Sequence, residues 1–225
     1  MKLNSSLSEK SVIDKIFLNR VVPDAFAASC PQSEIWNREF TFERGKFYRV
    51  DALSGGGKSS LCAFIYGLRN DYSGSIFIGD KNVESLDGEH LSAMRTLNIA
   101  YLPQDLALFP ELTAGENIQI KNSLTTHKTR QQINEMARSL DVDSLMNRKV
   151  STLSIGQQQR VAIIRALCQP FDFILLDEPV SHLDNENNFA VSQLVVSESI
   201  ANGAAIISTS VGNNLMIDNH FIVKL

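Results

Sequence analysis

A run of three glycines followed by a lysine and two serines carries the strongest chemical signal in the chain (residues 54–60, SGGGKSS). Glycines let the main chain approach a phosphate closely, and a helix that follows them presents its N-terminal N–H groups to the anion. The lysine is suited to the β- and γ-phosphates, and the first serine to Mg²⁺. The motif predicts a phosphate-binding loop with these nucleotide contacts: Ser54, Gly55, Gly56, Gly57, Lys58, Ser59 (also a Mg²⁺ ligand) and Ser60.

The loop departs from the GxxxxGK[ST] pattern at its first glycine, where the chain has Ala52. An alanine forced to a positive φ costs on the order of 1 kcal/mol, so we expect this turn to be shaped differently from a glycine turn. The alternative is a flexible Gly/Ser connector. A connector does not explain why GKSS stands between an apolar strand pattern and an amphipathic helix pattern.

Two adjacent carboxylates, Asp177 and Glu178, follow the apolar segment ILL. The carboxyl end of a buried strand is the edge at which open α/β sheets bind ligands. We expect Asp177 to hold Mg²⁺, directly or through water, and Glu178 to orient or deprotonate the water that attacks a γ-phosphate. The alternative, a strand that simply ends in solvent, becomes less attractive because Lys58 is present in the same chain.

Short apolar segments alternate with helical patterns along most of the chain, which is typical of an α/β fold with a largely parallel sheet. The predicted strands cover residues 47–53, 171–176 and 204–208. Apolar side chains at helical spacing after the glycines predict a helix with one buried face: Leu61, Phe64, Ile65 and Leu68. Residues 12–17 fit either a helix or a strand.

Residues 105–150 are more polar and helix-prone than the rest. Apolar residues at helical spacing predict a buried helix face there: Ile133, Met136, Ala137 and Leu140. We therefore expect a single domain over residues 1–225, in which an α/β core (about 35–104 and 151–225) carries a helical subdomain (about 105–150).

The composition restricts the class of protein. The chain has 225 residues, 44% of them hydrophobic, and a net charge of −4, which gives no general reason to expect nucleic-acid binding. No segment approaches the ~18 apolar residues of a membrane-spanning helix, and the N-terminus lacks the apolar centre of a signal peptide. Cys30, Cys62 and Cys168 fit neither a disulfide framework nor a metal-ligand pair. We expect a cytoplasmic protein with reduced thiols.

Three further motifs resemble the nucleotide-binding subunit of ATP-binding cassette (ABC) transporters. Residues 153–160 (LSIGQQQR) resemble the LSGGQ signature, residues 101–105 (YLPQD) the Q-loop, and residues 181–184 (SHLD) the D-loop. Their order and spacing also match, and the similarity covers about residues 35–210. The resemblance implies the ABC ATPase fold: a mostly parallel sheet, an N-terminal antiparallel β part and a helical subdomain.

The resemblance also implies a mechanism. ATP, bound with Mg²⁺, is expected to lie between the phosphate loop of one cassette and the signature of a second, paired head to tail. Ser154, Gly156 and Gln157 are the implied signature contacts to the nucleotide, in trans. Gln104 is implied in binding Mg²⁺ and the attacking water, and Asp184 in communication between the two sites. A single Gln or Asp in a surface loop would not by itself indicate such a role.

Two further motif positions depart from the family pattern, in addition to Ala52. Ile155 replaces the first signature glycine, a change we expect to be tolerated because its neighbours are kept. Ser210 stands where the family has a switch histidine on the γ-phosphate. Serine is shorter and carries no positive charge, so we expect slower hydrolysis or stronger dependence on a partner. Phe26 is our candidate for stacking on adenine, whereas Trp36 and Phe40 are expected in the core of the early strands.

The leading hypothesis is an ATPase subunit that drives a separate transmembrane subunit from the inner face of the cell membrane. Residues 106–118 are similar to cassettes of the lipoprotein-release, macrolide-export and cell-division group. The alternatives are a soluble ABC scaffold that does not transport and a regulatory nucleotide-binding subunit with little turnover. A P-loop kinase does not explain the signature. The sequence leaves open the transported substrate, the direction of transport and the choice between homodimer and heterodimer.

Overall fold

Two β-sheets of different kinds divide the strands in the computed structural model, which describes residues 11–225. The expectation that the N-terminus lacks the apolar centre of a signal peptide concerns residues 1–10, which lie outside these described residues. One sheet has four antiparallel strands in the order β2-β1-β4-β5, and the other has five parallel strands in the order β6-β7-β8-β3-β9. The expected α/β class is confirmed.

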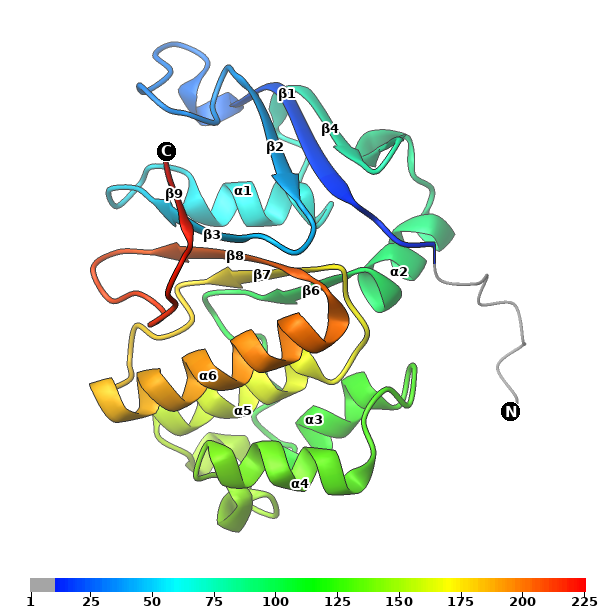
Figure 1. Ribbon diagram of the computed structural model, residues 1–225, viewed down its shortest axis with the longest axis vertical. Coiled ribbons are helices and arrows are strands. Elements are labelled where there is room, and N and C mark those ends of the chain that lie inside the picture. Colours follow the sequence, from blue (N-terminus) through cyan, green and yellow to red (C-terminus); the bar gives the residue numbers. More distant parts are fainter. Residues whose placement is uncertain (1–10) are drawn as a thin grey trace.

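The parallel sheet forms the centre of the molecule (Figure 1). Its strands are β3 (Phe47–Asp51), β6 (Ile99–Leu102), β7 (Phe173–Asp177), β8 (Ala205–Ser210) and β9 (Phe221–Lys224). Every residue of β7 and β8 is buried, because both strands are covered on both faces. Their carboxyl ends meet at one edge, and Asp177 of β7 is the register partner of Thr209 of β8.

Helix α1 (Lys58–Ile65) packs between the two sheets, in contact with β4, β7 and β8. The antiparallel strands are β1 (Lys15–Pro23), β2 (Glu39–Glu43), β4 (Tyr72–Ile78) and β5 (Lys81–Asn82). They enclose an apolar cluster that includes Trp36, Phe42 and Phe64. This cluster anchors the helix whose N-terminus follows the glycine loop.

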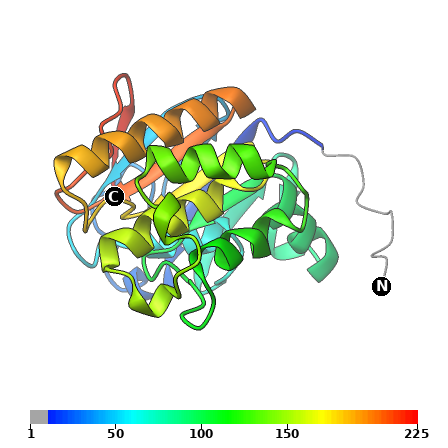
Figure 2. The same ribbon diagram turned by 90° about the horizontal axis from the view of Figure 1, so that it is seen from below.

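The other face of the parallel sheet is covered by α5 (Ile155–Leu167) and α6 (Asn185–Asn202). Helices α3 (Ala114–Asn122) and α4 (Arg130–Ser139) pack on this pair, and α2 (Gly88–Leu97) lies against β6. Viewed from below, the green helices lie in front of the sheet, beside the orange α6 (Figure 2). The predicted buried face of α4 is confirmed, because Ile133, Met136 and Ala137 are buried, as is Leu140 just after the helix.

Several predicted boundaries were wrong. The strand predicted over residues 47–53 ends at Asp51, since the chain turns into the glycine loop there. Helix α1 ends at Ile65, so Leu68 lies beyond it and is 55% exposed. The segment that fitted either a helix or a strand enters strand β1, which begins at Lys15. No helix among residues 11–225 combines the length and the apolarity needed to cross a membrane.

Candidate functional site

The glycine loop connects the end of β3 to the start of α1. Gly55 and Gly57 have φ values of 81° and 89°, which favour glycine because other residues are strained there. Gly57 is the N-cap of α1, and no side chain of the described residues caps it. The first N–H groups of α1 are therefore available to an anion.

Ala52 does not have a positive φ, so the cost of a left-handed alanine is avoided at this position. Its methyl group instead packs against Gly56. A Cβ placed on Gly56 would lie 2.8 Å from the Ala52 Cβ and 3.0 Å from the Leu53 carbonyl oxygen. The loop thus accommodates alanine at residue 52 because residue 56 has no side chain.

Lys58 points back into its own loop and is only 5% exposed. Its Nζ donates to the carbonyl oxygens of Ala52 and Leu53, each at 3.2 Å, and lies 4.0 Å from Glu178 Oε1. The buried ammonium group is held by acceptors that phosphate oxygens can replace. The structure therefore brings together Lys58 and Glu178, two residues that are far apart in the sequence.

The acidic pair lies at the carboxyl end of β7, as predicted. Asp177 is 2% exposed, and its Oδ1 accepts a hydrogen bond of 2.6 Å from Thr209 Oγ1. Its Oδ2 is buried and has no hydrogen-bond partner within residues 11–225. A buried carboxylate oxygen without a partner suits Mg²⁺ or a water bound to it, so Asp177 fits the predicted metal role. The pKa of the Cys62 thiol is raised mainly by burial and, to a smaller extent, by the charge of Asp177.

Glu178 is held in an unusual backbone conformation. Its φ is 52°, a left-handed value that costs a non-glycine residue about 1–2 kcal/mol. Its backbone N–H donates to the Thr209 carbonyl oxygen at 3.2 Å, which helps to fix the turn. Gln104, which follows β6, donates from Nε2 to Glu178 Oε2 at 3.3 Å. The carboxylate thus lies between a lysine and a glutamine.

The signature segment begins helix α5. Ser154 is its N-cap and forms a capping box with Gln157: the Gln157 N–H donates to Ser154 Oγ and the Ser154 N–H donates to Gln157 Oε1. Ile155, the first residue of the helix, is 49% exposed. A Cβ on Gly156 would lie 3.1 Å from the His182 carbonyl oxygen, so this glycine lets α5 approach the D-loop. Within one copy, the signature residues lie apart from the glycine-loop group as a capped helix start.

Gln159 is a connecting residue that the sequence analysis did not identify. Gln159 is 2% exposed, and its Nε2 donates to the Glu178 carbonyl oxygen at 3.1 Å. Its Oε1 accepts from the His182 N–H at 3.3 Å. Gln159 thereby links the signature helix to the turn at Glu178 and to the D-loop. Its polarity on the buried side of α5 was the available signal. Asp184 caps α6, and a hydrogen bond from the Asn187 backbone N–H lowers its pKa.

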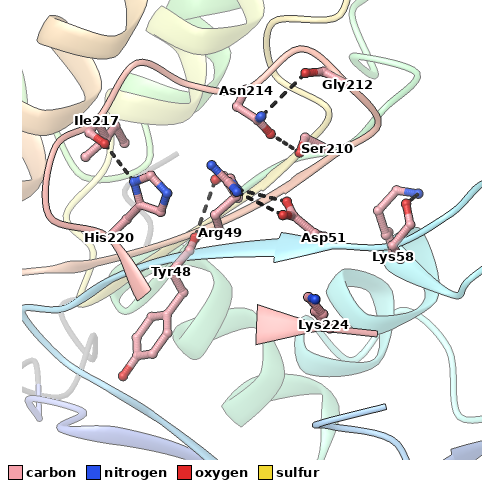
Figure 3. Close-up of polar contacts among 12 residues, drawn as sticks. Tyr48, Arg49, Asp51, Lys58, Ser210, Gly212, Asn214, Ile217, His220 and Lys224 are labelled. Atoms are coloured by element: carbon pink, nitrogen blue, oxygen red, sulfur yellow. Dashed lines mark hydrogen bonds and ion pairs between the residues drawn. The ribbon is translucent and has the colours of Figure 1, made fainter. Parts of the chain in front are cut away.

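Ser210 ends β8 and is 6% exposed. Its hydroxyl donates to Asn214 Oδ1, and Figure 3 shows the serine side chain directed at this asparagine. Asn213 donates from Nδ2 to the Val180 carbonyl oxygen at 2.7 Å, which ties the same loop to the D-loop. Ser210 is therefore engaged within its own loop rather than with Lys58 or Glu178.

Phe26 is half-buried beside the glycine loop. A Cβ built on Gly57 would lie 3.1 Å from both Phe26 Cε2 and Trp36 Cζ2. Trp36 is buried as expected, but it lies in a turn rather than a strand, and its Nε1 donates to the Gly56 carbonyl oxygen at 3.2 Å. Phe40, in β2, is half-buried. The place of Phe26 next to the phosphate loop is compatible with an adenine contact, which stays a prediction.

Comparison with known proteins identifies the family. The model of the ABC transporter family matches residues 36–181, which is more than half of the chain. The chain belongs to the ABC transporter family. Among its relatives is the lipoprotein-releasing system ATP-binding protein LolD 1 of Chlorobium chlorochromatii, 33% identical over 182 residues, which cover 79% of this chain and 74% of LolD 1. The fold, the glycine loop and the acidic strand end are thus those of an ABC ATPase.

Other relatives of this ABC ATPase are longer. The molybdate/tungstate import ATP-binding protein WtpC of Pyrococcus horikoshii is 35% identical over 65% of this chain, but the match spans only 42% of WtpC. The macrolide export ATP-binding/permease protein MacB of Rhodopseudomonas palustris is 33% identical over 75% of this chain and 26% of MacB. Importers and exporters therefore both occur among the relatives.

Solved structures agree with this assignment. The ATP-binding cassette MJ0796, solved as a dimer in a post-hydrolysis state with ADP and Pi bound, has a TM-score of 0.79 and 25% identity. The superposition covers 93% of this chain and 94% of MJ0796. The neighbour thus shares both the fold and nearly the whole extent of the chain.

Proposed function

We propose that the chain is the ATP-binding and ATP-hydrolysing subunit of a transporter, which pairs with a second cassette and drives a conformational change in a separate membrane subunit. The observation that carries the proposal is the position of Glu178, with Lys58 at 4.0 Å and Gln104 at 3.3 Å from its two carboxylate oxygens. Residues from three separate segments converge there on the place where a γ-phosphate and its attacking water belong.

Nucleotide binding begins at the glycine loop. The phosphates of ATP take the uncapped N–H groups of α1, and Lys58 exchanges the carbonyl oxygens of Ala52 and Leu53 for phosphate oxygens. Ser59, Asp177 and Gln104 are the residues that would hold Mg²⁺. When bound, Mg²⁺ supplies positive charge that neutralises the β- and γ-phosphate oxygens. The unpartnered Oδ2 of Asp177 supports this assignment.

Hydrolysis then depends on Glu178. Its carboxylate orients the attacking water and accepts its proton, while Gln104 restrains the carboxylate through the hydrogen bond to Oε2. The strained backbone of Glu178 is held by Thr209 on one side and Gln159 on the other. This support keeps the catalytic group in place before ATP arrives, which lowers the reorganisation needed in the transition state.

A second cassette completes the site. The N-terminus of α5, with Ser154, Gly156 and Gln157, is a helix start that favours anions and lies apart from the glycine loop of its own copy. Head-to-tail pairing would bring it to the γ-phosphate of the other copy. The dimeric solved neighbours support such pairing.

We assign the docking site of the membrane subunit to a groove beside the Q-loop. A hollow of about 380 Å³ lies there between the segment after α1, β6, α3 and α5, and Leu68 and Ile120 in its lining are exposed. Burial, followed by the charges of Arg165 and Arg95, lowers the pKa of Lys121 in this groove to about 8. The groove offers apolar surface, and the charged side chains in its lining are Lys121, Arg165 and Asp105. It adjoins Gln104, the glutamine that contacts Glu178. A complex at this groove would place the chain on the inner face of the membrane.

A regulatory subunit with little turnover is the second candidate. The observation that favours it is Ser210, which is neutral, buried and hydrogen-bonded to Asn214. Removing one contact that stabilises transition-state charge commonly costs about 10²–10³-fold in rate. The two candidates differ in turnover and share ATP binding.

Two matched variants test the proposal. Lys58→Ala should lose both ATP binding and hydrolysis. Glu178→Gln should keep ATP binding and lose about 10²–10⁴-fold in phosphate release, because only the proton acceptor is removed. Equal turnover by wild type and Glu178→Gln would support the regulatory subunit. Mass spectrometry of the complex purified from the native host tests the membrane partner, and soluble partners alone would support a scaffold.

A further inference from the structure

The turn at Glu178 needs support on both of its sides. Glu178 has a left-handed φ of 52°, a conformation that persists only where the surrounding structure holds it. Its N–H donates to the Thr209 carbonyl oxygen, and its own carbonyl oxygen accepts from Gln159 Nε2. These two hydrogen bonds hold Glu178 itself. The segment that follows it is held by a residue of the loop after β8.

That residue is Asn213. Its Nδ2 donates to the Val180 carbonyl oxygen at 2.7 Å and to the Leu183 carbonyl oxygen at 3.3 Å. Val180 is fully buried and comes two residues after Glu178. One planar amide group therefore holds both the exit of the Glu178 turn and the D-loop, because its two N–H donors have fixed directions.

Asn188 in α6 holds Asn213 in turn. Asn188 is fully buried, and its Nδ2 donates to Asn213 Oδ1 at 3.1 Å and to the Asn214 carbonyl oxygen at 2.8 Å. Its Oδ1 accepts from the Ser192 hydroxyl at 3.1 Å, and Ser192 Oγ accepts from the Met216 N–H at 2.8 Å. A buried amide is costly unless it is hydrogen-bonded, so this network favours one arrangement of the loop.

The end of β8 belongs to the same network. Ser210 donates to Asn214 Oδ1, and Asn214 Nδ2 donates to the Gly212 carbonyl oxygen at 3.4 Å (Figure 3). These side chains are neutral, and they hold backbone groups through the direction of their hydrogen bonds. The loop after β8 therefore has the construction of a support for the neighbouring turn.

We propose that Asn213 is a positioning residue for ATP hydrolysis, which keeps Glu178 directed at the attacking water, and that Asn188 holds Asn213 in place. The inference rests on the role of Glu178 in the proposed function and adds the residue that maintains its geometry. Without the hydrogen bonds to Val180 and Leu183, the segment after Glu178 can shift and the strained turn can relax. A displacement of about 1 Å at a reacting group can cost on the order of 10²-fold in rate.

The Asn213→Asp variant of the full chain tests the donor alone. The carboxylate keeps an oxygen for Asn188 but places its other oxygen against two backbone carbonyl oxygens, so the support is lost. We expect kcat for ATP hydrolysis to fall by about 10–100-fold. The dissociation constant for ATP, measured separately, should change by less than about twofold, because the glycine loop is untouched. Asn213→Ala removes the amide without adding charge, should also lower kcat, and decides the test if the aspartate variant does not fold.

Asn122→Asp is the matched control. Asn122 is 5% exposed, and its Nδ2 donates to the Lys128 carbonyl oxygen at 2.9 Å, so this substitution also sets a carboxylate oxygen against a backbone carbonyl. Asn122 is the last residue of α3 and lies outside the proposed catalytic group. The control should lose stability in urea titrations and keep its kcat. An equal fall in kcat in the control would overturn the assignment of Asn213.

A double-mutant cycle with Glu178→Gln tests whether Asn213 acts through Glu178. Single-turnover ATP hydrolysis is measured for the wild type, for Glu178→Gln, for Asn213→Asp and for the combined variant. Asn213→Asp should have little further effect once the proton acceptor is absent, because there is no longer a carboxylate to position. Independent losses that multiply in the combined variant would overturn the positioning role.

The same measurements separate this proposal from the proposed function. If Glu178→Gln hydrolyses ATP like the wild type, the proposed function is contradicted and the positioning role with it. If Glu178→Gln loses turnover while Asn213→Asp and Asn213→Ala keep a normal kcat, only the role of Asn213 is overturned. The ATPase assignment then stands.

Discussion

The carboxyl ends of β7 and β8 lie next to each other in the parallel sheet, yet they carry different chemistry. Strand β7 ends in two carboxylates, and Glu178 is held at a φ of 52° with contacts to the glycine loop and the Q-loop. Strand β8 ends in two hydroxyl residues, Thr209 and Ser210, and neither carries a charge. Thr209 supports its neighbours, whereas Ser210 is turned to its own loop.

The difference in chemistry between the two strand ends suggests that they have different roles. In the proposed function, the β7 end and the glycine loop bind Mg-ATP and position the attacking water. The β8 end, where the family has a charged contact to the γ-phosphate, holds the β7 end in place through Thr209. In the proposed function, the chain therefore keeps the groups that bind Mg-ATP, and Ser210 alters the contact to the terminal phosphate.

Breaking the link between the two strand ends should have the largest effect. Thr209 is fully buried, and Thr209→Val keeps its shape while it removes the 2.6 Å hydrogen bond to Asp177. The buried carboxylate then loses its donor, so we expect the free energy of unfolding to fall by about 2–4 kcal/mol in urea titrations. Ser208→Ala is the control, because Ser208 makes only a 3.4 Å contact to the Tyr48 carbonyl oxygen. Equal losses in the two variants would contradict a special role for Thr209.

The strand ends show what the sequence can and cannot predict. The glycine loop, the strand of Asp177 and the buried face of α4 were predictable, because local spacing and periodicity determine them. Gln159 and Asn213 were missed, because each acts on backbone groups of a segment that is distant in the sequence. The end of α1 was misplaced at Leu68, since an apolar residue at helical spacing does not show where the helix stops.

Substitutions in the glycine loop test the proposed ATP-binding site more directly. Gly57→Ala combines a φ of 89° with a Cβ only 3.1 Å from Phe26 and Trp36, so about 2–3 kcal/mol of stability and most of the ATP affinity should be lost. Gly55→Ala has a φ of 81° but nothing within 4 Å of the new Cβ, so only about 1–2 kcal/mol of strain is expected. Thermal unfolding and ATP titration compare the two variants. Similar losses would mean that the aromatic contact does not matter.

The smallest expected effect is a rise in the ATPase rate when Ser210, at the end of β8, is replaced. Ser210→His restores a side chain that can reach the γ-phosphate and carry a positive charge, so the steady-state ATPase rate should rise by about tenfold. A free histidine has a pKa of about 6.5, and the imidazole loses its charge as the pH rises through this region. The ratio of the variant rate to the wild-type rate should therefore be larger at low pH than at high pH. Ser210→Asn, which adds a neutral side chain of intermediate size, is the control for bulk alone. An unchanged or lower rate with histidine would mean that the loop after β8, which Asn213 ties to the D-loop, keeps residue 210 away from the phosphate.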